Sequence, residues 1–298
     1  MTLFQYRHSG LAVASQLQLP EWAAFASEFA EPDVEIVIDD RRIADCPRDG
    51  STIVDGANAR FAIDGIGGWQ IEGGQMIRLY PESTTNAREL RLFTLGSAWG
   101  ALGYQRGLAM WHGSAVARQG RAILFCGDAG AGKSTMAGGM LARGAKLVAD
   151  DLSRIDCGGD SAIIYPSSAR IKLWRAAIDM FGWSDRVLQQ DYFRDDKYHC
   201  SVPSNAADKE PVQLSGIVVL EDSEDTALDR LTGSEALSQV MRGTTYRPEM
   251  LQAMDLWSEQ GALAAQIVAK TPVWRLRRPK DYSALGKVCA ATEALWEQ

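Results

Sequence analysis

The residues best suited to chemistry in this 298-residue chain form a glycine-rich run, Gly127-Asp128-Ala129-Gly130-Ala131-Gly132-Lys133-Ser134-Thr135. The run satisfies the full G-x-x-x-x-G-K-[ST] (Walker A) pattern of phosphate-binding loops. Its glycines permit positive φ and close approach of the backbone, so successive N–H groups can form a nest for an anion. We expect the whole run to bind ATP, with Lys133 neutralising the β and γ phosphates and the Ser134 hydroxyl ligating Mg²⁺.

The sequence on either side of the run favours the same interpretation. The apolar segment 122–126 predicts a strand that enters it, and 134–143 predicts a helix that leaves it, with Gly144 in the left-handed capping position. The alternative is a glycine-rich turn without a ligand, which the complete pattern in this context disfavours. Asp128 is expected to point away from the phosphates, or toward the metal or a donor, because a carboxylate facing them would repel them.

Two adjacent acids, Asp150 and Asp151, follow a short predicted strand at 146–149. Because ligands of open α/β sheets bind at the carboxyl ends of strands, we expect both acids at the same edge as the loop. Neighbouring residues on a strand point to opposite faces, so the two acids can have different roles. We assign Asp150 as the general base for a hydroxyl proton and Asp151 as the Mg²⁺ ligand. The alternative is a turn-forming pair that caps the next element.

One histidine and several cations are weaker candidates. His112 lies just before the strand pair that leads into the loop, and for a histidine beside a glycine the structural and catalytic roles are both open. An extra cation would stabilise the charge that phosphoryl transfer spreads over oxygen atoms, although each available one is also a candidate for an ordinary surface residue. These cations are Arg170, Lys172, Lys197, Arg275, Arg277 and Arg278.

The elements that must position these residues indicate an α/β fold, α+β overall. In residues 1–106 we predict strands at 34–38, 61–63, 69–71 and 76–80, a hairpin turn at Gly73-Gly74, and a helix over 85–105. From 107 to 298, short apolar runs, which include predicted strands at 217–220 and 273–276, alternate with helical patterns, as is typical of a nucleotide-binding core. We therefore predict two domains, a β-rich region at 1–106 and a catalytic domain at 107–298. The polar segment 184–211 is predicted to be a long loop or flap.

Composition excludes several classes of protein. The chain has 31 Lys and Arg against 38 Asp and Glu, a net charge of −7, which argues against a broad nucleic-acid interface. No apolar run approaches the length of a membrane span or of a signal peptide. The five cysteines lie too far apart for a zinc knuckle or a CxxC motif, so we expect reduced thiols in a cytoplasmic protein. Nothing here fixes the oligomeric state, which leaves a homo-oligomer open.

The motifs taken together resemble a known family. His112-Gly113, the loop 127–134 and the segment Leu147-Val148-Ala149-Asp150-Asp151 resemble, in order and spacing, the catalytic domain of bacterial HPr kinase/phosphorylase. This resemblance implies a P-loop core with the phosphoenolpyruvate-carboxykinase-like fold. The segment 212–217 lacks the Glu and Arg of that family's later motif, so the resemblance does not imply HPr as the substrate or a reverse phosphorylase reaction.

A looser resemblance covers more of the chain. It is to the kinase-like proteins encoded beside ribosomal-peptide genes, including lasso-peptide kinases, and it is carried by residues 10–15, 19–21, 166–174, 197–198 and 275–279. It implies ATP- and Mg²⁺-dependent phosphorylation of a serine hydroxyl on a peptide or small protein, with His112 assisting the acid pair. Two alternatives stay open: a kinase for a small hydroxyl compound such as free serine or a sugar, and a nucleotide-gated binding protein without catalysis.

Overall fold

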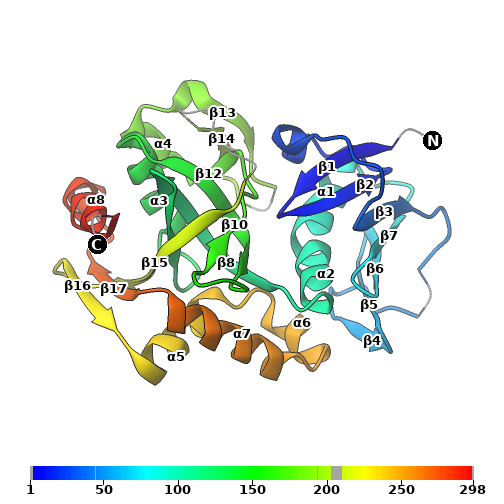
Figure 1. Cartoon of the computed structure of the whole chain (residues 1–298). Coiled ribbons are helices and arrows are strands. Elements are labelled where there is room, and N and C mark those ends of the chain that lie inside the picture. Colours follow the sequence, from blue (N-terminus) through cyan, green and yellow to red (C-terminus); the bar gives the residue numbers. More distant parts are fainter. Residues whose placement is uncertain (1–2, 44, 193, 203–209, 297–298) are drawn as a thin grey trace. The chain divides into compact units, whose positions relative to one another are not determined.

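The computed structural model describes residues 3–43, 45–192, 194–202 and 210–296, and it is a mixed α/β structure (Figure 1). The chain forms two compact units. Unit 1 consists of Met1–Met110 and Tyr246–Ala262, and unit 2 of Trp111–Thr245 and Leu263–Gln298. Compact units need not fold independently, so the two domains expected at 1–106 and 107–298 stay a prediction.

Unit 1 is built on a seven-stranded sheet with the strand order β1-β2-β3-β7-β6-β5-β4. Its strands are β1 (Phe4–His8), β2 (Leu11–Ser15), β3 (Val34–Ile38), β4 (Ile53–Asp55), β5 (Asn58–Ile63), β6 (Gly67–Glu72) and β7 (Met76–Pro81). The four strands predicted from the sequence are confirmed as β3, β5, β6 and β7. The predicted turn at Gly73-Gly74 is also confirmed, since both residues have positive φ, 55° and 69°.

The helix predicted at 85–105 is present in unit 1 with a local irregularity. It consists of α1 (Ala87–Phe93), a π-helical turn at Thr94–Ala98 and α2 (Trp99–Gln105). Asn86 and Glu89 begin it with a capping box, in which each side chain accepts a hydrogen bond from the backbone of the other residue. Unit 1 also contains a 3₁₀ helix at Pro20–Phe25 and α6 (Pro248–Ala253), while α7 (Trp257–Lys270) belongs in part to each unit.

Unit 2 contains a mixed seven-stranded sheet with the order β11-β10-β8-β9-β15-β17-β16. In it β9, β15 and β17 are parallel, whereas β8 and β16 run antiparallel to their neighbours β9 and β17. The strands are β8 (Ala109–Arg118), β9 (Arg121–Cys126), β10 (Lys146–Asp156), β11 (Ile163–Ile164), β15 (Val212–Asp222), β16 (Ala227–Leu231) and β17 (Val273–Arg278). The predicted strands 122–126, 217–220 and 273–276 are thus confirmed as parts of β9, β15 and β17.

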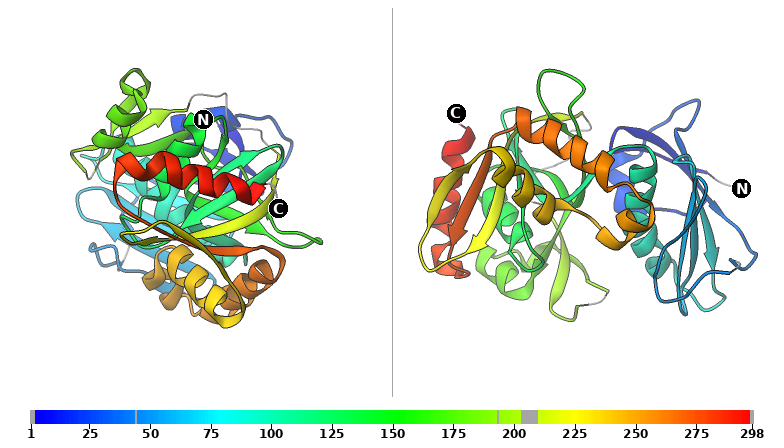
Figure 2. Two further views of the ribbon diagram at one scale, coloured as in Figure 1. Left: turned by 90° about the vertical axis from the view of Figure 1, so that its left-hand side faces the viewer. Right: turned by 90° about the horizontal axis from the view of Figure 1, so that it is seen from below.

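Helices pack on both faces of this sheet. On one face, α3 (Lys133–Ala142) and α8 (Leu285–Glu293) cover Ile123 and Phe125 of β9 within a continuous hydrophobic core. On the other face lies α5 (Gly233–Thr244), which contacts the next residue of β9, Cys126. The views in Figure 2 show α8 and α5 on either side of the sheet. This alternation along β9 fixes the strand on both sides just before it enters the loop.

The polar segment 184–211 does not form the predicted loop where it is described. It contributes β13 (Val187–Gln190) and β14 (Lys197–Ser201), which pair with β12 (Arg170–Trp174) in a three-stranded antiparallel sheet, and α4 (Arg175–Phe181) follows β12. Residues 193 and 203–209 of the predicted loop lie outside the described residues. The expectation failed because charged and polar side chains dominate a small sheet that buries only one face.

The strand expected to end at Ala149 instead continues through the two acids to Asp156 as β10. Asp151 adopts φ of +74°, a left-handed conformation that is uncommon for a residue with a side chain. This interrupts the strict alternation of faces that the sequence predicted for the acid pair. No helix in the described part of the chain has the length and apolar character needed to cross a membrane.

Candidate functional site

The glycine-rich run lies between β9 and α3, which are the strand and the helix that the Walker A pattern requires. Its three glycines all have positive φ: 135° at Gly127, 80° at Gly130 and 84° at Gly132. A Cβ atom on Gly132 would meet the guanidinium of Arg278, and one on Gly127 would lie 2.9 Å from the Leu220 carbonyl oxygen. Glycine is thus needed at both ends of the loop, for conformation and for space.

Backbone N–H groups of the loop are available for a ligand. Gly127 donates its N–H to the Gly243 carbonyl and Ala131 donates to the Asp128 carbonyl, which fixes the two turns of the loop. In the described part of the chain, the N–H groups of Ala129, Gly130 and Gly132 donate no such hydrogen bond. A cluster of unpartnered N–H groups at the start of a helix is an anion-binding nest.

Lys133 folds back over the loop. Its Nζ donates to the Gly127 carbonyl at 2.9 Å and to the Asp128 carbonyl at 3.1 Å, and the residue is only 8% exposed. Burial lowers the pKa of Lys133, while the charges of Asp151 and Asp150 raise it. The ammonium group therefore lies beside the N–H nest, at the position where it can contact a phosphate bound there.

Asp150 is held by a compact network of donors. Its Oδ1 accepts hydrogen bonds from the hydroxyls of Ser114 at 2.6 Å and Ser134 at 2.9 Å. Its Oδ2 accepts the backbone N–H of Lys172 at 2.8 Å. Burial and the neighbouring Asp151 raise the pKa of Asp150 above that of an ordinary carboxyl group. Asp150 is thus tied to the hydroxyl group that the Walker A pattern assigns to magnesium.

Asp151 has a different environment. Its Oδ2 forms an ion pair with Nζ of Lys172. Burial raises the pKa of Asp151, but the charges of Lys172 and His112 and the bond from Lys172 lower it well below its usual range, so the group is ionised at neutral pH. His112 lies against the backbone of Asp151, and burial with the charge of Lys133 lowers its pKa to about 4. His112 is therefore neutral at pH 7.

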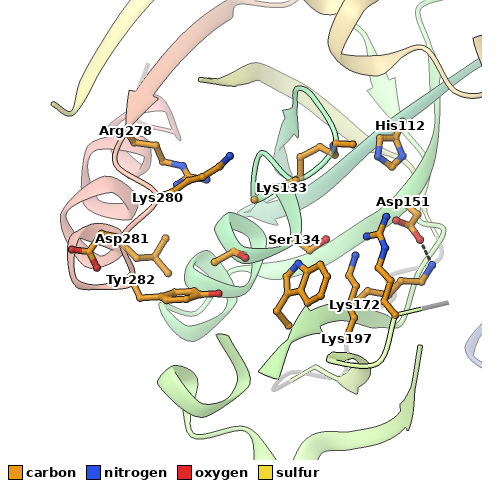
Figure 3. Close-up of a pocket in the computed structure, with 17 residues that line it drawn as sticks. His112, Lys133, Ser134, Asp151, Lys172, Lys197, Arg278, Lys280, Asp281 and Tyr282 are labelled. Carbon is orange, nitrogen blue, oxygen red and sulfur yellow. Dashed lines mark hydrogen bonds and ion pairs between the residues drawn. The ribbon is translucent and has the colours of Figure 1, made fainter. Parts of the chain in front are cut away.

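These groups line one cavity of about 290 Å³ in unit 2 (Figure 3). His112, Asp151 and Lys172 lie at one end, Arg278 and Tyr282 at the other, and Lys133 and Ser134 between them. Eight of the described lining residues carry full charges: six are cations, Lys133, Lys172, Arg194, Lys197, Arg278 and Lys280, and two are anions, Asp151 and Asp281. A pocket this basic in a chain of net charge −7 favours a polyanionic ligand.

The structure brings most of the sequence-predicted residues together. The cavity is lined by Ala129, Gly130, Gly132, Lys133, Ser134, Thr135, His112 and Asp151, whereas Gly127, Asp128, Ala131 and Asp150 do not line it. Asp128 points to a donor, as expected, and accepts a hydrogen bond from Arg242 at 3.1 Å. Of the weaker cation candidates, Lys172, Lys197 and Arg278 line the cavity and Arg170, Arg275 and Arg277 do not.

Several lining residues were missed from the sequence. Trp174, which lies in a segment quoted only for its family resemblance, is one of them, and the others are Arg194, Lys280, Asp281, Tyr282 and Leu285. Ser114, which bonds Asp150, had a usable signal. It lies two residues after His112 on β8, so strand alternation places both side chains on the same face. Lys172 and Trp174 are related in the same way on β12.

The residues around Ser134 fit magnesium. In the described part of the chain, no three His, Cys, Asp or Glu side chains cluster as a metal cage. Magnesium does not need one, because it commonly binds one or two protein oxygens together with phosphate oxygens and water. Ser134 Oγ and Asp150 Oδ1, 2.9 Å apart, would hold such an ion beside the N–H nest.

Comparison with known proteins gives limited information. No protein-family model matches the sequence, and no curated protein matches it. Among solved structures, the HPr(Ser) kinase/phosphatase from Coxiella burnetii is similar to 63% of this chain and 99% of its own, with 12% sequence identity and a TM-score of 0.33. This similarity is too weak to assign a function to the chain.

Proposed function

We propose that this protein is an ATP- and Mg²⁺-dependent kinase that transfers the γ-phosphoryl group to a hydroxyl, with a serine of a peptide or small protein as the acceptor. One observation carries the proposal: an ionised carboxylate paired with a lysine lies in the same cavity as a Walker A loop with unpartnered N–H groups. Such a loop binds phosphates, and the carboxylate beside it supplies a base for the attacking hydroxyl.

The contacts support an assignment of the two acids opposite to the one made from the sequence. Asp150 shares a hydrogen bond with Ser134, so we assign it to the magnesium ion. Asp151 lines the cavity and is ionised, so we assign it as the general base. The proton of the acceptor hydroxyl passes to Asp151 as the new O–P bond forms and the bond from Pγ to the ADP oxygen breaks.

Cations around the acid pair fit this chemistry. Lys172 forms an ion pair with Asp151 and lines the same cavity as the loop, so we expect it to stabilise the charge that develops on the phosphoryl oxygens. His112 is neutral and therefore adds no positive charge. It positions Asp151 by contacting the backbone of Asp151. With the γ-phosphate at the acid end, the nucleoside extends toward Arg278 and Tyr282 at the other end of the cavity (Figure 3).

Other features agree with a kinase that works in the cytoplasm. The five cysteines are free thiols, four of them buried, as expected for a reducing compartment. We propose a small-protein or peptide partner and neither a nucleic acid nor a membrane, since a net charge of −7 argues against a broad nucleic-acid interface and no helix of the described residues could cross a membrane.

The experiment that tests the proposal is a phosphoryl-transfer assay. The protein is incubated with ATP, Mg²⁺ and a panel of serine peptides, and products are followed by mass. Lys133→Met, which keeps the volume but removes the ammonium, should lower kcat/KM by roughly 10²–10³-fold because one donor to the phosphates is lost. ATP binding without phosphate on any peptide would contradict the peptide kinase. A parallel panel of free serine and sugars detects a small-molecule kinase.

A further inference from the structure

Two cations in the cavity lie over the ring of one tryptophan. The guanidinium of Arg194 and the ammonium of Lys197 are each 5.8 Å from the centroid of Trp174. Trp174 is 40% exposed, although it lines the cavity. In the described part of the chain, neither cation forms an ion pair. Two positive charges near one ring repel each other, and an anion bound between them would offset this repulsion.

The position of this group is fixed by strand register. Lys172 and Trp174 lie two residues apart on β12, on the face opposite to buried Ile171 and Leu173. In the neighbouring strand β14, Lys197 pairs directly with Trp174. Trp174 and Lys197 are therefore one step, roughly 6–7 Å, along the sheet from the lysine that holds Asp151. The charge of Lys197 also lowers the pKa of both Asp150 and Asp151, which agrees with this proximity.

The nucleotide has other partners in the cavity. The loop N–H groups, Lys133, Lys172, Arg278 and Lys280 lie along the path from the acid pair to Tyr282. Lys197 lies in β14 of the small β12-β14-β13 sheet, at the end of the cavity that holds Asp151, and Arg194 lies three residues earlier, in the turn between β13 and β14. They are thus in reach of the acceptor, which must approach Asp151 from the side that the nucleotide leaves open.

Exposed apolar side chains indicate the size of the acceptor. Among the described residues, seven large hydrophobic side chains are exposed, and four of them fall within 174–192: Trp174, Met180, Leu188 and Tyr192. Two of them, Trp174 on β12 and Leu188 on β13, alternate with the more buried side chains of their strands, and exposed apolar side chains on one small sheet are typical of a surface that contacts a polypeptide. Binding of a small hydroxyl compound would not require contact with Leu188, which lies on β13 and is 58% exposed.

We propose that Arg194, Lys197 and Trp174 form an acceptor subsite that binds a carboxylate next to the phosphorylated serine, so that an acidic peptide is the preferred acceptor. This proposal rests on the proposed kinase function and specifies its substrate class. The two cations supply a charge-assisted contact, and the tryptophan ring supplies a flat apolar wall against which the peptide backbone can lie.

The test measures binding, which does not require turnover. Two peptides that differ only in Glu or Gln beside the serine are titrated into the full chain loaded with ADP and Mg²⁺, at low and at high salt. We expect the Glu peptide to bind about tenfold tighter at low salt, with a smaller difference at high salt. Equal affinity of the two peptides would overturn the proposal.

Variants then locate the contact. Arg194→Gln should reduce the tenfold preference to about twofold, and Lys197→Gln should do the same. Arg175→Gln is the matched control, because Arg175 also lies over an aromatic ring, at 4.1 Å from Tyr198, but does not line the cavity. The Arg175→Gln variant should prefer the Glu peptide over the Gln peptide as strongly as the wild type does. If Arg175→Gln lost the preference and Arg194→Gln kept it, the subsite would be wrongly placed.

Two further outcomes separate this inference from the kinase itself. If Arg194→Gln weakened ADP binding as much as peptide binding, the cations would serve the nucleotide and the subsite proposal would fail while the kinase stood. If the Glu peptide bound with the expected preference but gained no phosphate from ATP, the kinase would fail and the acidic-peptide site would stand. Binding of small anionic hydroxyl compounds in place of both peptides would overturn the peptide as the occupant.

Discussion

Asp150 and Asp151 are neighbours in the chain, yet different partners hold them. Asp150 contacts hydroxyls and a backbone N–H, whereas Asp151 contacts an ammonium. We expect Asp151→Asn to lower kcat by roughly 10²–10⁴-fold with little change in Mg²⁺ affinity, because it removes a base and no metal ligand. Asp150→Asn should instead raise the Mg²⁺ concentration needed for half-maximal activity. Steady-state kinetics at varied Mg²⁺ distinguish the two.

Asp156→Asn is the control for this pair. Asp156 lies on the same strand, β10, and contacts Arg154 and the turn at Gly158, away from the cavity. Its kcat should stay within about twofold of the wild type, as is usual for a surface substitution. If Asp151→Asn lost Mg²⁺ affinity and Asp150→Asn lost only kcat, the order assigned from the sequence would be the correct one.

At the residue level, the sequence predicted the motif-bearing part of the site and little else. Pattern and spacing predicted the loop, Lys133 and the acids, because phosphate binding needs those types in that order. Arg194 and Tyr282 carry no local signature. They reach the cavity through the pairing of β14 with β12 and through the chain reversal after β17, which are long-range features. The roles that we propose for the two acids also depend on contacts that only the fold provides.

At the level of elements, the sequence predicted mainly those strands and helices that a run of apolar residues or a motif marks. The strands β3, β9, β15 and β17 were predicted because buried apolar residues mark them, and α3 because the loop motif fixes its start. The strands β13 and β14 were read as a loop, since their side chains are mostly polar and one face is exposed. Helix α5, amphipathic and partly polar, was not predicted at all. Contacts with other parts of the fold determine the secondary structure of these three segments, and their composition does not indicate it.

Helix α5 approaches the loop closely enough to give a further prediction. A Cβ atom on Gly243 would lie 2.9 Å from the backbone nitrogen of Gly127, which donates to the Gly243 carbonyl. Gly243→Ala should therefore push the loop away from the helix, lower the free energy of unfolding by about 1–3 kcal/mol and weaken ADP binding. Thermal unfolding and calorimetric titration measure the two effects.

Gly286→Ala provides the matched control for Gly243→Ala. Gly286 lies in α8, and a Cβ atom there would meet nothing within 4 Å. Since alanine favours the helical conformation, this variant should be more stable by up to about 1 kcal/mol, with unchanged ADP affinity. If Gly243→Ala bound ADP as tightly as Gly286→Ala does, the helix would not support the loop in the way that the contacts indicate.

At the scale of the whole molecule, charge is distributed unevenly. The chain carries −7 overall, yet six of the eight charged side chains that line the cavity are cations. A negative net charge disfavours the approach of polyanions in general, whereas the cations of the cavity favour a small polyanion there. His112 is half-buried, and its burial together with the nearby cations Lys133 and Lys172 lowers its pKa, so the stability of the unit that contains it depends on pH.

The pH dependence of unfolding follows from His112. Its pKa is lowered from 6.5 to about 4 in the folded chain, so between these values the unfolded chain binds more protons. The stabilisation is complete above pH 6.5 and falls as the pH drops, by about 2.5 kcal/mol at pH 4.5. Asp150, with its raised pKa, acts in the opposite direction, so the comparison must be with His112→Gln. Urea unfolding at pH 7 and pH 4.5 should show a smaller loss of stability in His112→Gln than in the wild type. An equal loss in both would mean that His112 is protonated in the folded state near its ordinary pKa.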